Sequence, residues 1–222
     1  MGPSSRVRQI NLLCTVHRPN GLCNTKELLG MLRRLDPDVI FEEMRPSDTN
    51  EYYKTGTKWS VESQAIGVFS KERSVVQVPV DNFDGAVALF AEVNPLFDFV
   101  DGNSYEYVAL HEERGRRAYS EGYGFLNSGE CDAMTRRLRE IFERTIVDSR
   151  QESLIRALGK WNVMNMARED AMLTNIYTFC KNHKFKNGTF LVGAAHRETI
   201  IGAIKRQNAA ASVSIDWSWA ES

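Results

Sequence analysis

The feature that most constrains this chain is a strand–helix–strand order near its start, part of which recurs near its end. Residues 7–14 form an apolar segment with β propensity, residues 25–35 carry leucines at helical spacing, and residues 38–41 form a second short apolar segment. Two strands joined through a helix are typical of a parallel pair with a right-handed crossover. Residues 189–192 again form an apolar segment that leads into a helical pattern. The order of these segments predicts an α/β fold.

Two more strands and a long helical region are expected in the rest of the chain. Residues 75–80 predict a third strand with Pro79 near its end, and residues 211–217 alternate as a last strand. Residues 46–53 are polar and predict a loop, whereas residues 83–180 show mostly helical patterns. Within that helical region, breaks are expected at Asn94-Pro95, Asp101-Gly102-Asn103, Gly122-Tyr123-Gly124 and Ser128-Gly129.

The length of 222 residues fits one domain of ordinary size. We therefore expect residues 1–222 to form a single α/β domain with a central, mostly parallel sheet flanked by helices. A helical insertion over about residues 83–160 is expected to act as a cap. Residues 1–6 are set aside as a disordered tail or the remnant of a tag.

Charge and hydropathy argue against several classes of partner. Lys and Arg number 28 against 29 Asp and Glu, so the net charge of −1 predicts no basic surface for nucleic acid or an anionic membrane. No apolar run approaches the ~20 residues of a membrane-spanning helix. The four cysteines are scattered without the spacing of a zinc site or a disulfide framework. We expect a cytoplasmic protein that acts on a small molecule or a peptide, with its oligomeric state left open.

Polar side chains follow each of the first four predicted strands. In open parallel sheets, ligands bind outside the carboxyl ends of the strands, where the following loops and helices meet. Four separate strand ends thus predict one site along the same edge of the sheet. The residues at these ends are His17 after the first strand, Glu42 and Glu43 after the second, Asp81 and Asn82 after the third, and Gly193 to His196 after the fourth.

These residue types leave two kinds of chemistry open. Two histidines with one or more carboxylates can hold a divalent metal, or they can supply a general base and a polarising acid for attack by water. The spacing along the chain does not separate these alternatives. Because side chains alternate along a strand, Glu42 and Glu43 are expected to point in opposite directions, with Glu42 turned away from the site.

Three motifs in this order resemble the TraB/TIKI superfamily, which includes erythromycin esterase-like proteins and ChaN-like haem-binding proteins. Its shared pattern is an early Gly-x-x-His, a Pro-Asp-led strand that ends in Glu, and a late Gly-x-x-His. Cys14 stands where the family usually has glycine, and Glu43 occupies the position of the family's glutamate. The matching segments are Cys14-Thr15-Val16-His17, Pro37-Asp38-Val39-Ile40-Phe41-Glu42-Glu43 and Leu191-Val192-Gly193-Ala194-Ala195-His196.

The resemblance implies a hydrolase that cleaves an ester, lactone or amide bond. Glu43 would be the general base or a metal ligand, and His17 and His196 would orient water or complete the metal site. Residues 166–172 resemble the family's arginine-bearing helix, so Arg168 would stabilise negative charge on the substrate. A surface ion pair with a neighbouring carboxylate is the structural alternative for Arg168.

Substrate contacts are expected from residues next to these motifs. Gly193 opens the last motif and Arg18 follows His17, while Tyr52 and Tyr53 lie in the predicted loop after the second strand. Two other functions stay open: binding of haem or another small ligand without turnover, and a degenerate regulatory or interaction domain on the same fold. The expected cofactor is therefore a divalent metal, haem or none.

Overall fold

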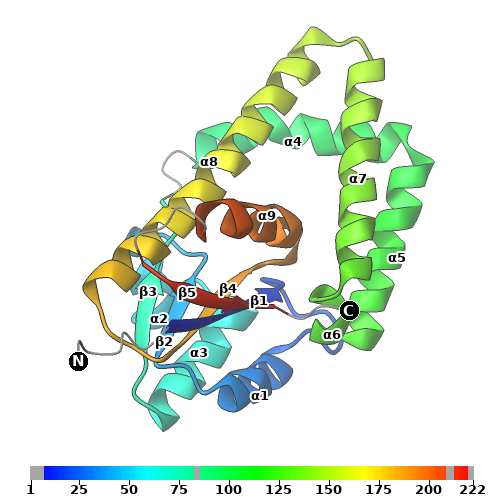
Figure 1. The fold of residues 1–222 in the computed structure, drawn as a ribbon. Coiled ribbons are helices and arrows are strands. Elements are labelled where there is room, and N and C mark those ends of the chain that lie inside the picture. The colour runs from blue at the N-terminus through cyan, green and yellow to red at the C-terminus, as the bar shows by residue number, and fades with distance from the viewer. Residues whose placement is uncertain (1–7, 83–85, 209–212, 220–222) are drawn as a thin grey trace.

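The computed structural model describes residues 8–82, 86–208 and 213–219, and it is an α/β fold with a five-stranded, all-parallel sheet at its centre (Figure 1). The strand order is β3-β2-β4-β1-β5. The predicted α/β architecture with a helical insertion is confirmed. The strands are β1 (Arg8–Thr15), β2 (Val39–Glu42), β3 (Val76–Pro79), β4 (Asn187–Gly193) and β5 (Ile215–Ser218).

The register of the sheet aligns the carboxyl ends of its inner strands. Thr15 at the end of β1 lies opposite Gly193 at the end of β4. On the other side of β4, Glu42 at the end of β2 lies opposite Leu191. β2 and most of β4 are buried, because helices cover both faces of the sheet. The segments that follow β1, β2 and β4 therefore emerge along the same edge of the sheet.

Helices cover the two faces of the sheet (Figure 1). On one face, α1 (Thr25–Leu35) packs against α3 (Val61–Glu72). Asn24 caps α1 through its side chain, and Ser60 begins α3 with a capping box, so both helices start where the sequence supplies a capping oxygen. On the other face lie α9 (Arg197–Asn208) and the C-terminal half of α8 (Glu152–Asn182).

The helical insertion carries a second hydrophobic cluster of its own. Its helices enclose buried side chains that include Leu96, Phe142 and Leu158. α8 is one unbroken helix whose first turns belong to this cluster and whose later turns pack on the sheet, so it continues beyond the expected end of the insertion at about residue 160. The helices are α4 (Ala86–Asn103), α5 (Tyr105–Glu121), α6 (Tyr123–Leu126), α7 (Gly129–Asp148) and α8.

Some predicted boundaries are wrong. α4 runs through Pro95, so the break expected there does not occur, whereas the break expected at residues 101–103 falls at Ser104, directly after them, where α4 ends and α5 begins. The predicted loop over residues 46–53 instead forms a 3₁₀ turn, η1 (Pro46–Asp48), and a short helix, α2 (Thr49–Tyr53).

Two expectations concern parts of the chain that the structure describes only in part or not at all. The predicted last strand begins at Ile215, and residues 209–212 lie outside the described residues. The tail predicted over residues 1–6 also lies outside them. Across the described part of the chain, no helix combines the length and apolar character needed to span a membrane.

Candidate functional site

The residues predicted at the strand ends meet around Gly193. A Cβ built on this glycine would lie 3.3 Å from Oε2 of Glu43, 3.8 Å from Nε2 of His17 and 3.9 Å from Cδ2 of His196. One carboxylate and two imidazoles therefore surround the backbone at the end of β4. The structure brings His17, Glu43 and His196 together at the carboxyl edge of the sheet, where parallel sheets bind their ligands.

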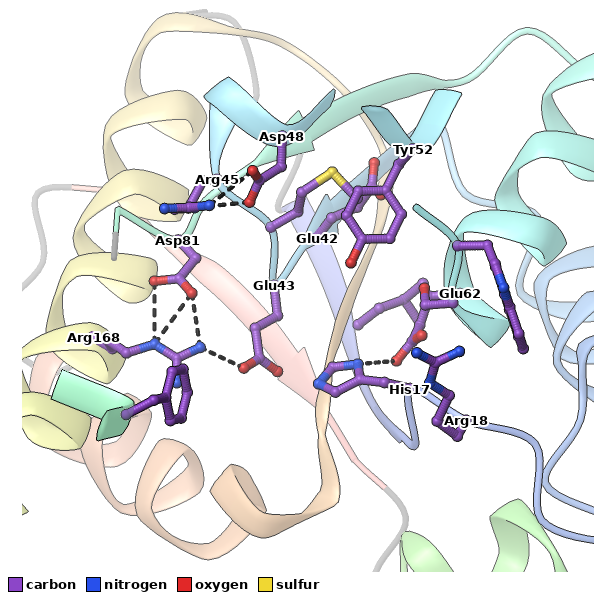
Figure 2. Close-up of a pocket in the computed structure, with 15 residues that line it drawn as sticks. His17, Arg18, Glu42, Glu43, Arg45, Asp48, Tyr52, Glu62, Asp81 and Arg168 are labelled. Carbon is purple, nitrogen blue, oxygen red and sulfur yellow. Dashed lines mark hydrogen bonds and ion pairs between the residues drawn. The ribbon is translucent and has the colours of Figure 1, made fainter. Parts of the chain in front are cut away.

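Both carboxylate oxygens of Glu43 already accept hydrogen bonds. Oε2 accepts from the backbone N–H of Gly193 at 2.7 Å, and Oε1 accepts from Nη2 of Arg168 at 2.7 Å. Arg168, which lies on α8, also donates to Oδ2 of Asp81 from Nη2 at 2.7 Å and from Nε at 3.2 Å (Figure 2). The guanidinium is thus shared by two buried carboxylates. Arg168 thus makes buried ion pairs with carboxylates from two other parts of the chain, whereas the predicted alternative was a surface ion pair with a carboxylate next to it on the helix.

His196 is oriented by a carboxylate from α8. Its Nδ1 lies 2.7 Å from Oε1 of Glu169, and the hydroxyl of Thr199 donates to the same oxygen at 2.8 Å. Because a carboxylate only accepts hydrogen bonds, Nδ1 carries the proton and Nε2 is the free acceptor in the neutral ring. This Nε2 lies 3.6 Å from Oε1 of Glu43, so the free nitrogen faces the centre of the site.

His17 is held in a similar way by Glu62 on α3. Nδ1 of His17 lies 3.0 Å from Oε1 of Glu62, which also accepts from the hydroxyl of Thr15 at 2.6 Å. The hydrogen bond to Glu62 raises the pKa of His17 to about 9, against a smaller opposing effect of burial. Burial disfavours the ionised form of Glu62, but its hydrogen bonds with His17 and Thr15 hold the pKa of this carboxyl below its ordinary value. At neutral pH the pair is therefore an imidazolium beside a carboxylate.

Glu42 lines the same cavity as Glu43, so the expectation that it turns away from the site is wrong. β2 ends at Glu42, so Glu43 is the first residue after the strand. The buried carboxyl of Glu42 accepts a hydrogen bond from the hydroxyl of Tyr53. Burial raises the pKa of Glu42 to about 7. The two neighbouring glutamates thus have different hydrogen-bond partners.

The predicted substrate-binding residues lie around the cavity in different ways. Tyr52 lines the cavity, whereas the hydroxyl of Tyr53 donates a hydrogen bond to Glu42. Both tyrosines lie on α2 and not in the predicted loop. Arg18 stacks its guanidinium over the ring of Trp59, 4.7 Å from the ring centroid.

A cavity of about 360 Å³ lies next to these side chains, and it is lined by His17 and Glu43 but not by His196 or Tyr53 (Figure 2). Its wall carries five carboxylates and four basic side chains, so the cavity suits a polar group more than a large apolar one. The charged residues that line it are Glu42, Glu43, Asp48, Glu62, Asp81, His17, Arg18, Arg45 and Arg168.

The expected metal ligands His17, Glu43 and His196 do not fit a metal site in this geometry. Within residues 8–82, 86–208 and 213–219, no group of three or more His, Cys, Asp or Glu side chains is placed to hold a metal ion. The cation next to Glu43 is the guanidinium of Arg168, and a metal bound to the same carboxylate would meet its like charge. The arrangement agrees better with chemistry performed by the side chains themselves.

Two carboxylates essential to this arrangement were missed by sequence reasoning. Glu62 and Glu169 each fix Nδ1 of one histidine, and both lie within helices rather than at strand ends. Glu62 falls in the first turn of α3, where an acidic residue is also explained by the helix dipole. Glu169 follows Arg168 directly, and no sequence signal distinguishes it from an ordinary surface carboxylate.

Comparisons of this chain with protein-family models, curated proteins and solved structures find no match.

Proposed function

We propose that this protein is a hydrolase that activates water between Glu43 and His196 and cleaves an ester, lactone or amide bond. The observation that carries the proposal is the free Nε2 of His196, which lies 3.6 Å from Glu43 while Glu169 holds the opposite nitrogen. A histidine oriented by a carboxylate and facing a site for water is the usual arrangement of a general base. The resemblance to the TraB/TIKI superfamily points to the same class of reaction.

The proton of the attacking water goes to His196 in this proposal. Sequence reasoning assigned this step to Glu43, but both oxygens of Glu43 already accept hydrogen bonds from strong donors. Glu43 instead orients the water and, with Glu169, stabilises the imidazolium that forms on His196. The hydroxide adds to the carbonyl carbon, and His196 then returns the proton to the departing alkoxide or amine.

Negative charge on the carbonyl oxygen is stabilised by His17. Its ring is an imidazolium at neutral pH, because its pKa is raised to about 9, and its Nε2 lies near the backbone of Gly193. Arg168 was expected to take this role, but Glu43 and Asp81 share its charge. We assign Arg168 the task of holding Glu43 in position.

The alternative of a haem-binding protein has less support. A haem ligand needs a free imidazole nitrogen that faces an apolar slot. The free nitrogen of His196 instead faces the carboxylate of Glu43, and His17 borders a cavity lined by charged groups.

A substrate panel tests the proposal. We expect the purified chain to hydrolyse at least one member of a set of aryl esters, lactones and aryl amides, before and after dialysis against a chelator. Loss of turnover on chelation, with recovery on adding a divalent metal, would contradict the metal-free mechanism. Absence of turnover with every member, together with a haem absorption band in the purified protein, would contradict the hydrolase itself.

A further inference from the structure

A second cavity, of about 530 Å³, lies between the helical insertion and the site. At one end it is lined by His196, Glu169 and Thr199, the residues that form the proposed general base. Arg168 lines both this cavity and the smaller one around Glu43. A group bound in the second cavity would therefore lie next to the water-activating residues.

The insertion supplies this cavity with a continuous aromatic wall. Phe97 of α4 lies 5.1 Å from Phe142 of α7 and 5.6 Å from Trp161 of α8, measured between ring centroids. Phe142 in turn lies 5.7 Å from Tyr107 of α5. These four rings line the cavity and belong to the second hydrophobic cluster or pack against it. Such a wall fits an aryl or acyl group of the size that small-molecule sites enclose.

Two arginines of the same cavity lack anionic partners. Among the described residues, Arg114 of α5 and Arg139 of α7 make no ion pair and no side-chain hydrogen bond, and Nε of Arg114 is buried without an acceptor. The acidic side chains of the cavity are already engaged: Glu143 accepts from Asn162 at 3.1 Å, and Glu169 holds His196. A buried charged donor without an acceptor is costly, so an anion bound here would satisfy Nε of Arg114, and the exposed Arg139 would add a second positive charge next to it.

We propose that the second cavity binds the part of the substrate that carries an apolar body and a carboxylate. The apolar body lies against the aromatic wall, the carboxylate pairs with Arg114 and Arg139, and the bond to be cleaved points toward His196. This inference rests on the proposed hydrolase for the reaction and adds the class of substrate, an apolar compound that bears a free carboxylate in addition to the ester, lactone or amide bond that is cleaved.

Binding of 4-phenylbutyrate and of its neutral amide, measured by calorimetry on the full chain, tests the inference without relying on turnover. We expect the carboxylate to bind at least about tenfold more tightly than the amide, because a charge-assisted hydrogen bond is lost in the amide. Arg114→Gln and Arg139→Gln should each weaken binding of the carboxylate by a similar factor and leave binding of the amide unchanged. Arg114→Lys should retain most of the affinity, and Arg34→Gln, on the exposed face of α1, is the matched control.

The outcomes separate this inference from the proposed hydrolase. Equal binding of 4-phenylbutyrate and its amide by the wild-type protein would overturn the carboxylate site. So would loss of binding of both probes in Arg114→Gln and Arg139→Gln variants whose circular dichroism matches the wild type. His196→Ala should still bind 4-phenylbutyrate, since the arginines and the aromatic wall remain. Binding with the expected preference in a protein that hydrolyses nothing in the panel would support the cavity and contradict the proposed reaction.

Discussion

At the scale of single residues, the site depends on carboxylates that fix one nitrogen of each histidine. His17 and His196 were predictable because each follows a strand, and Glu43 because it ends a Pro-Asp-led strand. Glu62 and Glu169 were not, because their contacts exist only once α3 and α8 are packed on the sheet. Sequence reasoning therefore found the residues that meet at the sheet edge but missed the carboxylates that orient the two histidines.

The charge on His17 provides a direct test of its pairing with Glu62. We expect nuclear magnetic resonance titration of the His17 ring to give a pKa of about 9 in the wild-type protein. Glu62→Gln should lower this pKa toward 6.5, the ordinary value, because it removes the charged acceptor. The exposed Glu27→Gln is the matched control and should leave the titration unchanged. A wild-type midpoint near 6.5 would contradict the pairing.

The same pair affects stability in a defined pH window. The folded-state pKa of His17 is raised, so its contribution to stability is fully present below about pH 6.5 and is lost as the pH rises through about 9. Because the side chain of His17 is 58% exposed, solvent screens the pair and the contribution is small.

Glu42 predicts a second pH dependence of stability, and here the charged form of the side chain is destabilising. Its pKa is raised from 4.5 to about 7 by burial, so ionisation opposes folding and the penalty grows as the pH rises from about 4.5 to 7. Glu42→Gln removes that penalty while keeping an acceptor for Tyr53, and it should stabilise the protein at pH 8 by on the order of 1–3 kcal/mol. Urea unfolding at pH 4 and pH 8 measures this, with the exposed Glu112→Gln as control. A gain that is the same at both pH values would show that burial of the charge is not its cause.

At the scale of secondary-structure elements, apolar runs and capping residues were reliable, whereas polar runs and prolines were not. β2 and α1 follow from an apolar run and from the cap at Asn24. Pro95 does not end α4, because packing of its neighbours Val93 and Leu96 into the second cluster outweighs the lost backbone hydrogen bond. The polar residues 46–53 form helical turns because their side chains pair locally, as Arg45 does with Asp48.

One side chain connects the helical insertion to the central sheet. Asn127, between α6 and α7, accepts a hydrogen bond from the backbone N–H of Cys14 at 2.8 Å and donates to the carbonyl of Cys14 at 3.0 Å. Asn127→Ala leaves both buried backbone groups unpaired and should lower the free energy of unfolding by about 2–4 kcal/mol.

Urea denaturation of the two asparagine variants measures this effect. Asn182→Ala removes an exposed side chain at the end of α8 and should change stability by no more than about 0.5 kcal/mol. Equal, small losses in both variants would mean that the contact between Asn127 and Cys14 does not stabilise the fold.

At the scale of the whole molecule, α8 joins the two hydrophobic clusters and carries the site between them. Its first turns contribute Leu154 and Leu158 to the second cluster, and its later turns contribute Met172 to the core under the sheet. Arg168 and Glu169 lie between these parts, next to both cavities. The parallel sheet was predictable from the order of segments, but the path of α8 was not, because its pattern of apolar residues serves two different cores.

The most direct test of the proposed active site is to measure activity and stability together in Glu43→Gln and His196→Ala. Against a substrate identified with the panel, we expect kcat/KM to fall by ~10²–10⁴ in each variant, as is usual when a general base or its partner is removed. Thermal denaturation should show that both variants are still folded at the assay temperature, with the lower melting temperature in Glu43→Gln because this change breaks the buried pair with Arg168, and the exposed His183→Ala should change neither activity nor stability. Early unfolding of both variants, with activity reduced only in proportion to the folded fraction, would contradict the account and show that these residues stabilise the fold without taking part in the reaction.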